Sequence, residues 1–90
     1  MKVILLNGAK MRDRESTHDY LKRKLSLPDY YGNNLDALWD CLTADFSPKK
    51  IIIYNLDKLI ETPDSYGESI ISLLQEAARD NEYIEVKILK

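Results

Sequence analysis

Two aspartates one helical turn apart, with a tryptophan beside them, are the side chains of this sequence that are best placed to do chemistry. Asp36, Trp39 and Asp40 lie in the segment YYGNNLDALWDCLT, residues 30–43. Asn34 is a favourable helix N-cap, so a short helix is predicted from Asn34 to Thr43. Paired carboxylates on one helix could act as an acid–base pair, hold a cation or contact a basic partner.

Around this predicted helix, at about 100° per residue, apolar and acidic side chains fall into two neighbouring arcs, with Trp39 on the border. Asp36 has a simple explanation, because the helix dipole favours a carboxylate in the first turn. Asp40 lies toward the C-terminal half, where a negative charge costs about 0.3–1 kcal/mol, and its like-charge i,i+4 spacing costs about 0.2–0.5 kcal/mol more. The inward arc holds Leu35, Leu38 and Leu42, and the outward arc holds Asp36, Asp40 and Thr43.

A purely structural interpretation remains open for each feature taken alone. The two carboxylates would then be a solvated face, and Trp39 would be half-buried core. Tyr30, Tyr31 and Gly32 would merely close a loop over the core, with Gly32 supplying the turn geometry. Together, however, these aromatic and acidic residues lie within 11 positions, a composition typical of an anchor set in a protein–protein interface.

An enzyme is a weaker interpretation of the same residues. A general acid–base pair, as in glycoside hydrolysis, needs a pocket that separates two carboxyl pKa values, and the sequence shows neither such a pocket nor a nearby nucleophile. A divalent-metal site from Asp36, Asp40 and Glu76 is geometrically conceivable, but no recognised loop spacing supports it. We therefore expect neither catalysis nor a bound cofactor.

The acidic residues are unevenly distributed along the chain. Between residues 25 and 48 there are four aspartates and no Lys or Arg, although the formal net charge of the whole chain is only −2. Such a window repels phosphate backbones and attracts cationic surfaces. Direct binding of nucleic acid is therefore not expected.

Length and composition predict one folded domain over residues 1–90. Apolar residues make up 44% of the chain and charged residues 31%, which is far from the composition of a disordered protein. The apolar run near the N-terminus is too short for a secretory signal or a membrane span, so a cytoplasmic protein is expected. Cys41 is the sole cysteine, which excludes an intramolecular disulfide and a thiolate zinc cluster.

Short β-branched runs alternate with helical patterns along the chain. Residues 3–6 and 51–54 read as strands that are central or covered on both faces, and residues 84–88 as a strand with one wet face. One helix is expected after a Ser16-x-x-Asp19 capping pattern and another after Gly67. A short helical turn is expected at 56–60, closed by Thr62-Pro63. This alternation predicts an α/β fold with a small parallel sheet.

The segment LSLPDYYGNNLDALWDCLT closely resembles the signature segment of the barstar family, intracellular inhibitors of the extracellular ribonuclease barnase. The resemblance extends over the first strand, the QEA segment at 75–77 and the last strand. It implies a small two-layer fold with a three-stranded parallel sheet and about four helices, a monomer when free, and one-to-one binding of a basic barnase-type ribonuclease.

The resemblance also implies how individual residues meet the ribonuclease. Asp40 would take the place of a substrate phosphate, Asp36 would pair with a second basic group, and Thr43 would add a contact beside them. Tyr30 would lie over the active-site histidine. The rim and periphery would comprise Gly32, Asn34, Leu35, Trp39, Ala44, Asp45 and Glu76.

The loop at 44–48 departs from the family prototype, which carries Gly then Trp there and is one residue longer. The alternative to a barnase-type inhibitor is therefore a binding module of the same fold for a different basic partner, such as another nuclease or a toxin, with this loop setting specificity. His18 is expected to be an ordinary surface or packing residue.

Overall fold

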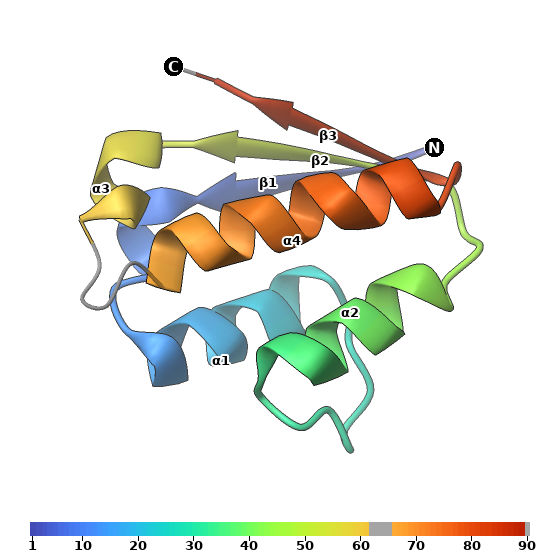
Figure 1. The fold of residues 1–90 in the computed structure, drawn as a ribbon, viewed down its shortest axis with the longest axis horizontal. Coiled ribbons are helices and arrows are strands. Elements are labelled where there is room, and N and C mark those ends of the chain that lie inside the picture. The colour runs from blue at the N-terminus through green and yellow to red at the C-terminus, as the bar shows by residue number, and fades with distance from the viewer. Residues whose placement is uncertain (62–65, 90) are drawn as a thin grey trace.

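The computed structural model describes residues 1–61 and 66–89 (Figure 1). The strands are β1 (Lys2–Asn7), β2 (Lys49–Tyr54) and β3 (Ile84–Ile88). The helices are η1 (Gly8–Lys10, a 3-10 turn), α1 (Arg14–Lys24), α2 (Leu35–Thr43), α3 (Leu56–Ile60) and α4 (Tyr66–Asp80).

The three strands form one parallel sheet in the order β1-β2-β3, so β2 is central. In its register Ile4 pairs with Ile51, and Ile51 with Val86. Parallel neighbours need long crossovers, and here α1 and α2 lie in the first connection and α3 and α4 in the second. The expected α/β fold, with a three-stranded parallel sheet and about four helices, is confirmed.

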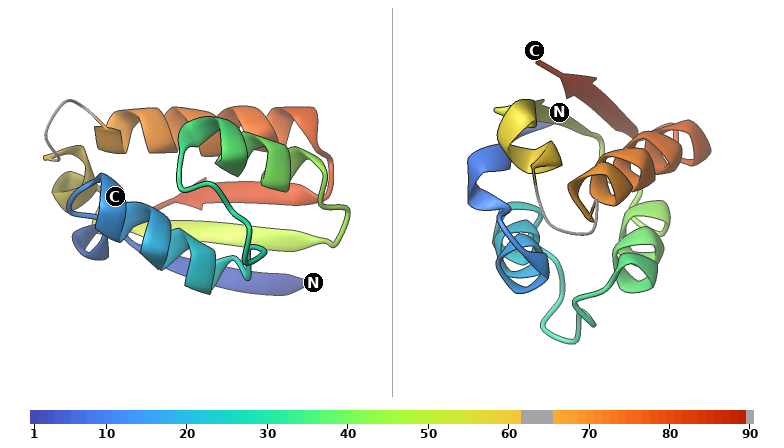
Figure 2. Two further views of the ribbon diagram at one scale, coloured as in Figure 1. Left: turned by 90° about the horizontal axis from the view of Figure 1, so that it is seen from below. Right: turned by 60° about the vertical axis from the view of Figure 1, so that its left-hand side comes forward.

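One face of the sheet is covered by helices (Figure 2). α1 and α4 lie on this face, and α2 packs against α4 farther from the strands. Ile4 and Ile51 point into the core, whereas Val3 and Leu5 are 56% and 50% exposed. The expectation that the first strand is central or covered on both faces is therefore wrong, because β1 is an edge strand and its outer side chains meet solvent.

Other expectations on the elements are confirmed. β3 has one wet face, since Glu85 and Lys87 are exposed while Ile84 is buried. The short helical turn at 56–60 is α3, whereas the closure expected at Thr62-Pro63 lies outside the described residues. Within residues 1–61 and 66–89 no helix is both long enough and apolar enough to cross a membrane.

α1 begins earlier than the Ser16-x-x-Asp19 pattern predicts. Asp13 is its N-cap: the carboxylate accepts a hydrogen bond from the Ser16 N–H at 2.8 Å, and the Ser16 hydroxyl oxygen accepts one from the Asp13 N–H at 3.3 Å. These reciprocal bonds satisfy two backbone donors at the helix end, so Ser16 belongs to the first turn and is not the cap. The correction moves the helix start to Arg14.

Candidate protein-binding site

α2 starts where the sequence predicts, and its cap also fixes the preceding loop. The Asn34 side-chain oxygen accepts a hydrogen bond from the Ala37 N–H at 2.7 Å, and its amide donates to the Gly32 carbonyl at 3.2 Å. The residue of this loop with a left-handed backbone conformation is Asn33, with φ of 53°, and not Gly32, the candidate source of the turn geometry. Asparagine tolerates this conformation better than most residues.

The two arcs expected around α2 are confirmed. Leu38 and Leu42 are buried, and Asp36 and Asp40 are exposed. Leu35 and Trp39 are half-buried at the boundary. The remaining outward residue, Thr43, donates its hydroxyl hydrogen to the Trp39 carbonyl at 2.8 Å. Its hydroxyl oxygen is left as an acceptor on the outer surface.

A groove runs between α2 and α4, and it brings together acidic residues that are far apart in the sequence. Asp36 and Glu76 both line it, as does Glu68, which the sequence analysis missed. The spacing of Glu68, Ser72 and Glu76 at i, i+4 and i+8 on α4 is the signal that could have found Glu68. The groove is lined by Leu35, Asp36, Trp39, Glu68, Ser69, Ser72, Leu73 and Glu76.

The charged side chains described in this groove are all acidic. Its described lining contains three carboxylates and no Lys or Arg. Asp40 extends the charge along the outward arc of α2. We call Asp36, Asp40, Glu68 and Glu76 the acidic face. Like charges gathered on one surface raise the local concentration of cations and attract basic proteins.

A second hollow lies on the other side of α2, next to the loop that precedes it. Tyr30, the exposed aromatic residue of that loop, lines this hollow together with Asp40, Ala44 and Asp45. The structure thus brings the two ends of the predicted site together around Asp40.

The loop itself is tied to the core through Tyr31. Its hydroxyl lies 2.5 Å from Nδ1 of His18, and Nε2 of His18 is hydrogen-bonded to the hydroxyl of Tyr66 at the start of α4. His18 is only 1% exposed, and burial lowers the pKa of its imidazole below 6.5. The histidine is therefore a packing residue, as expected, but with a polar role that joins α1, the loop and α4.

The comparison with protein families decides which family this chain belongs to. The model of the family described as "Barstar (barnase inhibitor)" matches residues 1–89. The chain belongs to the barstar family. A protein of Bacillus subtilis (strain 168) named "Putative ribonuclease inhibitor YrdF" is 40% identical over 81 residues, which cover 89% of each chain. The family is one of inhibitors, so the chain is not an enzyme.

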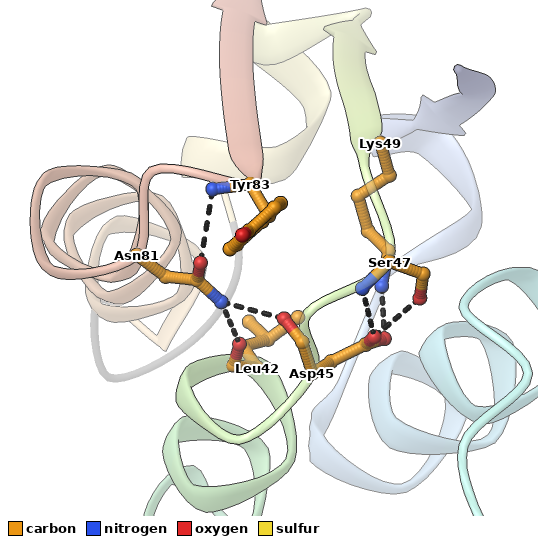
Figure 3. Close-up of polar contacts among 6 residues, drawn as sticks. All are labelled: Leu42, Asp45, Ser47, Lys49, Asn81 and Tyr83. Carbon is orange, nitrogen blue, oxygen red and sulfur yellow. Dashed lines mark hydrogen bonds and ion pairs between the residues drawn. The ribbon is translucent and has the colours of Figure 1, made fainter.

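Asp45 differs from Asp36 and Asp40 of this barstar-family chain, because its carboxylate is engaged by side chains of the loop and of β2 (Figure 3). It pairs with the Lys49 ammonium group and accepts hydrogen bonds from the hydroxyl and the N–H of Ser47, the latter at 2.9 Å. Partial burial raises the pKa of Asp45, but the hydrogen bonds from Lys49 and Ser47 outweigh it and lower the pKa to about 2. Its role as a partner contact remains a prediction.

Two further observations concern metal binding and the reactivity of Cys41. Among the described residues, no three His, Cys, Asp or Glu side chains are grouped so that they could hold a metal ion. Burial, together with the nearby charge of Asp40, raises the pKa of the Cys41 thiol. The thiolate is therefore disfavoured at neutral pH, which makes this cysteine a poor nucleophile.

Proposed function

We propose that this chain is an intracellular, cytoplasmic inhibitor of a secreted barnase-type ribonuclease. It binds one to one and covers the cationic active site with the acidic face and the adjoining loop. The observation that carries the proposal is the groove between α2 and α4, where three carboxylates meet without a cation among the described lining residues. Family membership supports a ribonuclease as the partner.

The physical basis is charge complementarity. An RNA-cleaving site is cationic because it binds phosphates, and a carboxylate can replace a phosphate oxyanion in charge-assisted hydrogen bonds to Arg and His. In the proposed complex Asp40 occupies the phosphate position, Asp36 pairs with a second basic group and Thr43 adds a contact. Tyr30 lies over the catalytic histidine.

The remaining proposed contacts surround this centre. The half-buried Trp39 ring and Leu35 side chain exclude water from the charged pairs, which strengthens these pairs. The free inhibitor is proposed to be a monomer with its acidic face open. The rim and periphery comprise Gly32, Asn34, Leu35, Trp39, Ala44, Asp45, Glu68 and Glu76.

The test is a titration of the protein into a small basic ribonuclease of the barnase type, with cleavage of a fluorogenic RNA substrate as the readout. Asp40→Asn removes one charge with little change in shape. Glu85→Gln is the matched control, because Glu85 is an exposed carboxylate on β3. A sharp one-to-one endpoint for the wild type and Glu85→Gln, lost in Asp40→Asn, is the expected result.

The shorter loop at 44–48 favours a second candidate, a barstar-fold module for a different basic partner. In that case a folded wild-type sample leaves RNA cleavage unchanged but still binds a basic protein through the acidic face. Loss of that binding in Asp40→Asn, without any effect on ribonuclease activity, would establish the second candidate in place of the first.

A further inference from the structure

An exposed pair of aromatic rings lies just beyond the C-terminal end of α2. Phe46 is 68% exposed and Tyr83 is 40% exposed, and their rings meet edge to face with centroids 5.9 Å apart. Single exposed aromatic residues are common, but two in contact form an apolar patch of the kind that marks interaction sites.

The segment that carries Phe46 is held by hydrogen bonds from two sides (Figure 3). On one side, the carboxylate of Asp45 is bound by Lys49 and Ser47. On the other, the buried amide of Asn81 donates to the Asp45 carbonyl at 2.7 Å.

Asn81 also holds the backbone that carries the second ring. The same amide donates to the carbonyl of Leu42, in the last turn of α2, at 2.9 Å, and its oxygen accepts from the Tyr83 N–H at 2.9 Å. The backbones of both aromatic residues are therefore held by one network that joins α2, the loop after it and the turn between α4 and β3. A preorganised backbone loses little conformational freedom on binding, so contacts made from it contribute more to affinity.

The hollow beside the two rings is continuous with the outward arc of α2, because Thr43 belongs to both. Among the described residues, its charged lining consists of Asp80, Glu82 and Arg79, which gives a net charge of −1 from two carboxylates and one guanidinium. An aromatic surface with an excess of carboxylates matches a planar cation better than an apolar or acidic group.

We propose that Phe46 and Tyr83 form a docking site for an arginine side chain of the ribonuclease, next to the acidic face. The guanidinium plane stacks on an aromatic ring while its N–H groups reach the carboxylates of Asp80 and Glu82. This inference rests on the proposed function and assigns to it a second, aromatic contact region that the acidic face does not include.

The experiment measures inhibition of the barnase-type ribonuclease by wild type, Phe46→Ala and Tyr83→Ala. Each aromatic truncation is expected to weaken binding about tenfold or more, mainly through faster dissociation. Leu5→Ala is the matched control, because Leu5 is a comparably exposed apolar residue on the open face of the sheet. Thermal melting monitored by circular dichroism checks that all variants are folded.

Charge variants in the same hollow test the nature of the occupant. Asp80→Asn is expected to weaken inhibition severalfold. Arg79→Gln removes the cation that would repel an incoming guanidinium, so it is expected to tighten inhibition. A general loss of stability would weaken inhibition in both variants, so weaker inhibition by Asp80→Asn together with tighter inhibition by Arg79→Gln is not expected from it.

The outcomes distinguish failure of the docking site from failure of the proposed function. If wild type inhibits and Phe46→Ala inhibits equally well, the docking site is wrong and the proposed function stands. If Leu5→Ala weakens inhibition as much as the aromatic truncations do, the docking site is also wrong. If Arg79→Gln does not tighten inhibition, no arginine occupies the hollow and the docking site is again overturned. If folded wild type does not inhibit, the proposed function and this part of it are both overturned.

Discussion

Nδ1 of His18 and the hydroxyl of Tyr31 lie 2.5 Å apart inside the protein, and this contact joins the loop before α2 to the centre of α1. The second ring nitrogen is hydrogen-bonded to Tyr66 of α4. A neutral imidazole offers one donor and one acceptor, so it can donate to one tyrosine and accept from the other. Protonation would convert the acceptor into a second donor and place a charge in a buried site.

The first prediction is that the free energy of unfolding falls at mildly acidic pH because of His18. Burial holds the folded-state pKa below 6.5, Arg14 lowers it further and Asp19 opposes the shift. The unfolded chain therefore binds the proton more readily. The stabilisation is complete above about pH 6.5, and it is lost as the pH falls from there through the folded-state pKa. Urea unfolding from about pH 8 to about pH 5 measures this loss.

His18→Gln is the control for that experiment, because a side-chain amide offers both a donor group and an acceptor but does not titrate in this range. The variant is expected to lose less stability than wild type between about pH 6.5 and about pH 5. Parallel curves for the two proteins would show that another group is responsible.

A second prediction concerns Asp45 and Lys49. Their side chains are 37% and 6% exposed, so Asp45→Asn leaves a buried ammonium group without its counter-ion. Because Asp45 is partly exposed to solvent, we expect a loss of about 1–2 kcal/mol in the free energy of unfolding, less than for a fully buried pair. Chemical denaturation at neutral pH measures it, and Glu85→Gln, an exposed carboxylate, is the control with little expected effect.

The pH dependence of the same pair follows from the lowered pKa. Asp45 titrates at about 2 in the folded protein, against an ordinary value of 3.8. Its contribution is therefore present above about pH 4 and is lost as the pH falls from 3.8 to about 2. A wild-type acid-unfolding curve that coincides in this range with that of Asp45→Asn would contradict the assignment.

Much of the fold could be predicted from local signals. β-branched runs and helical patterns identified the three strands and the four α-helices but not the 3-10 turn η1, and Asn34 correctly marked the start of α2. Local signals failed where the tertiary structure determines the exposure of a strand or the start of a helix. The apolar run of β1 gave no sign that Val3 and Leu5 lie on an open face of an edge strand, and two cap patterns competed at the start of α1.

The candidate site, too, could be predicted from the sequence only where its residues share one local element. Its centre could be found in the sequence because Asp36 and Asp40 share one helix. Glu68 was missed because only the packing of α4 against α2 brings it to Asp36. The role of His18 was missed because its hydrogen-bond partners, Tyr31 and Tyr66, are 13 and 48 residues away in the chain. Contacts between distant residues carry no periodic signal.

A third prediction ranks two carboxylates of the acidic face. Asp40→Ala should weaken inhibition by about 2–5 kcal/mol, the usual cost of truncating one partner of a buried charge pair. The complex of barnase with barstar is itself a standard example of such costs, so the range is carried over from that complex. Asp36→Ala should weaken inhibition less, because in the proposed complex Asp40 occupies the central phosphate position and Asp36 pairs with a second basic group. Titrations of both variants against the same ribonuclease measure the order.

Stability should respond to Asp40→Ala in the opposite sense. The carboxylate lies toward the C-terminal end of α2 and one turn from Asp36, so its removal relieves two local repulsions. The melting temperature is therefore expected to stay the same or rise slightly. A markedly lower melting temperature, or equal losses of inhibition for the two variants, would contradict this account of the acidic face.

The last prediction is that salt acts on association more than on dissociation. Long-range attraction between the acidic face and a cationic active site should bring the association rate constant toward about 10⁸–10⁹ M⁻¹s⁻¹ at low salt, again a range exemplified by barnase and barstar. Screening shortens the reach of these charges to about 10 Å at 0.1 M salt and about 3 Å at 1 M. Stopped-flow mixing across this range should show slower association and nearly constant dissociation.

A charge-depleted variant provides the control for this steering effect. Glu68→Gln combined with Glu76→Gln removes two carboxylates from the α4 side of the groove and leaves Asp40 in place. Its association rate should fall less steeply with salt than that of wild type, because fewer charges act at long range. If the wild-type association rate were flat in salt, or the slopes of the two proteins were equal, the acidic face would act only after contact, through short-range pairing.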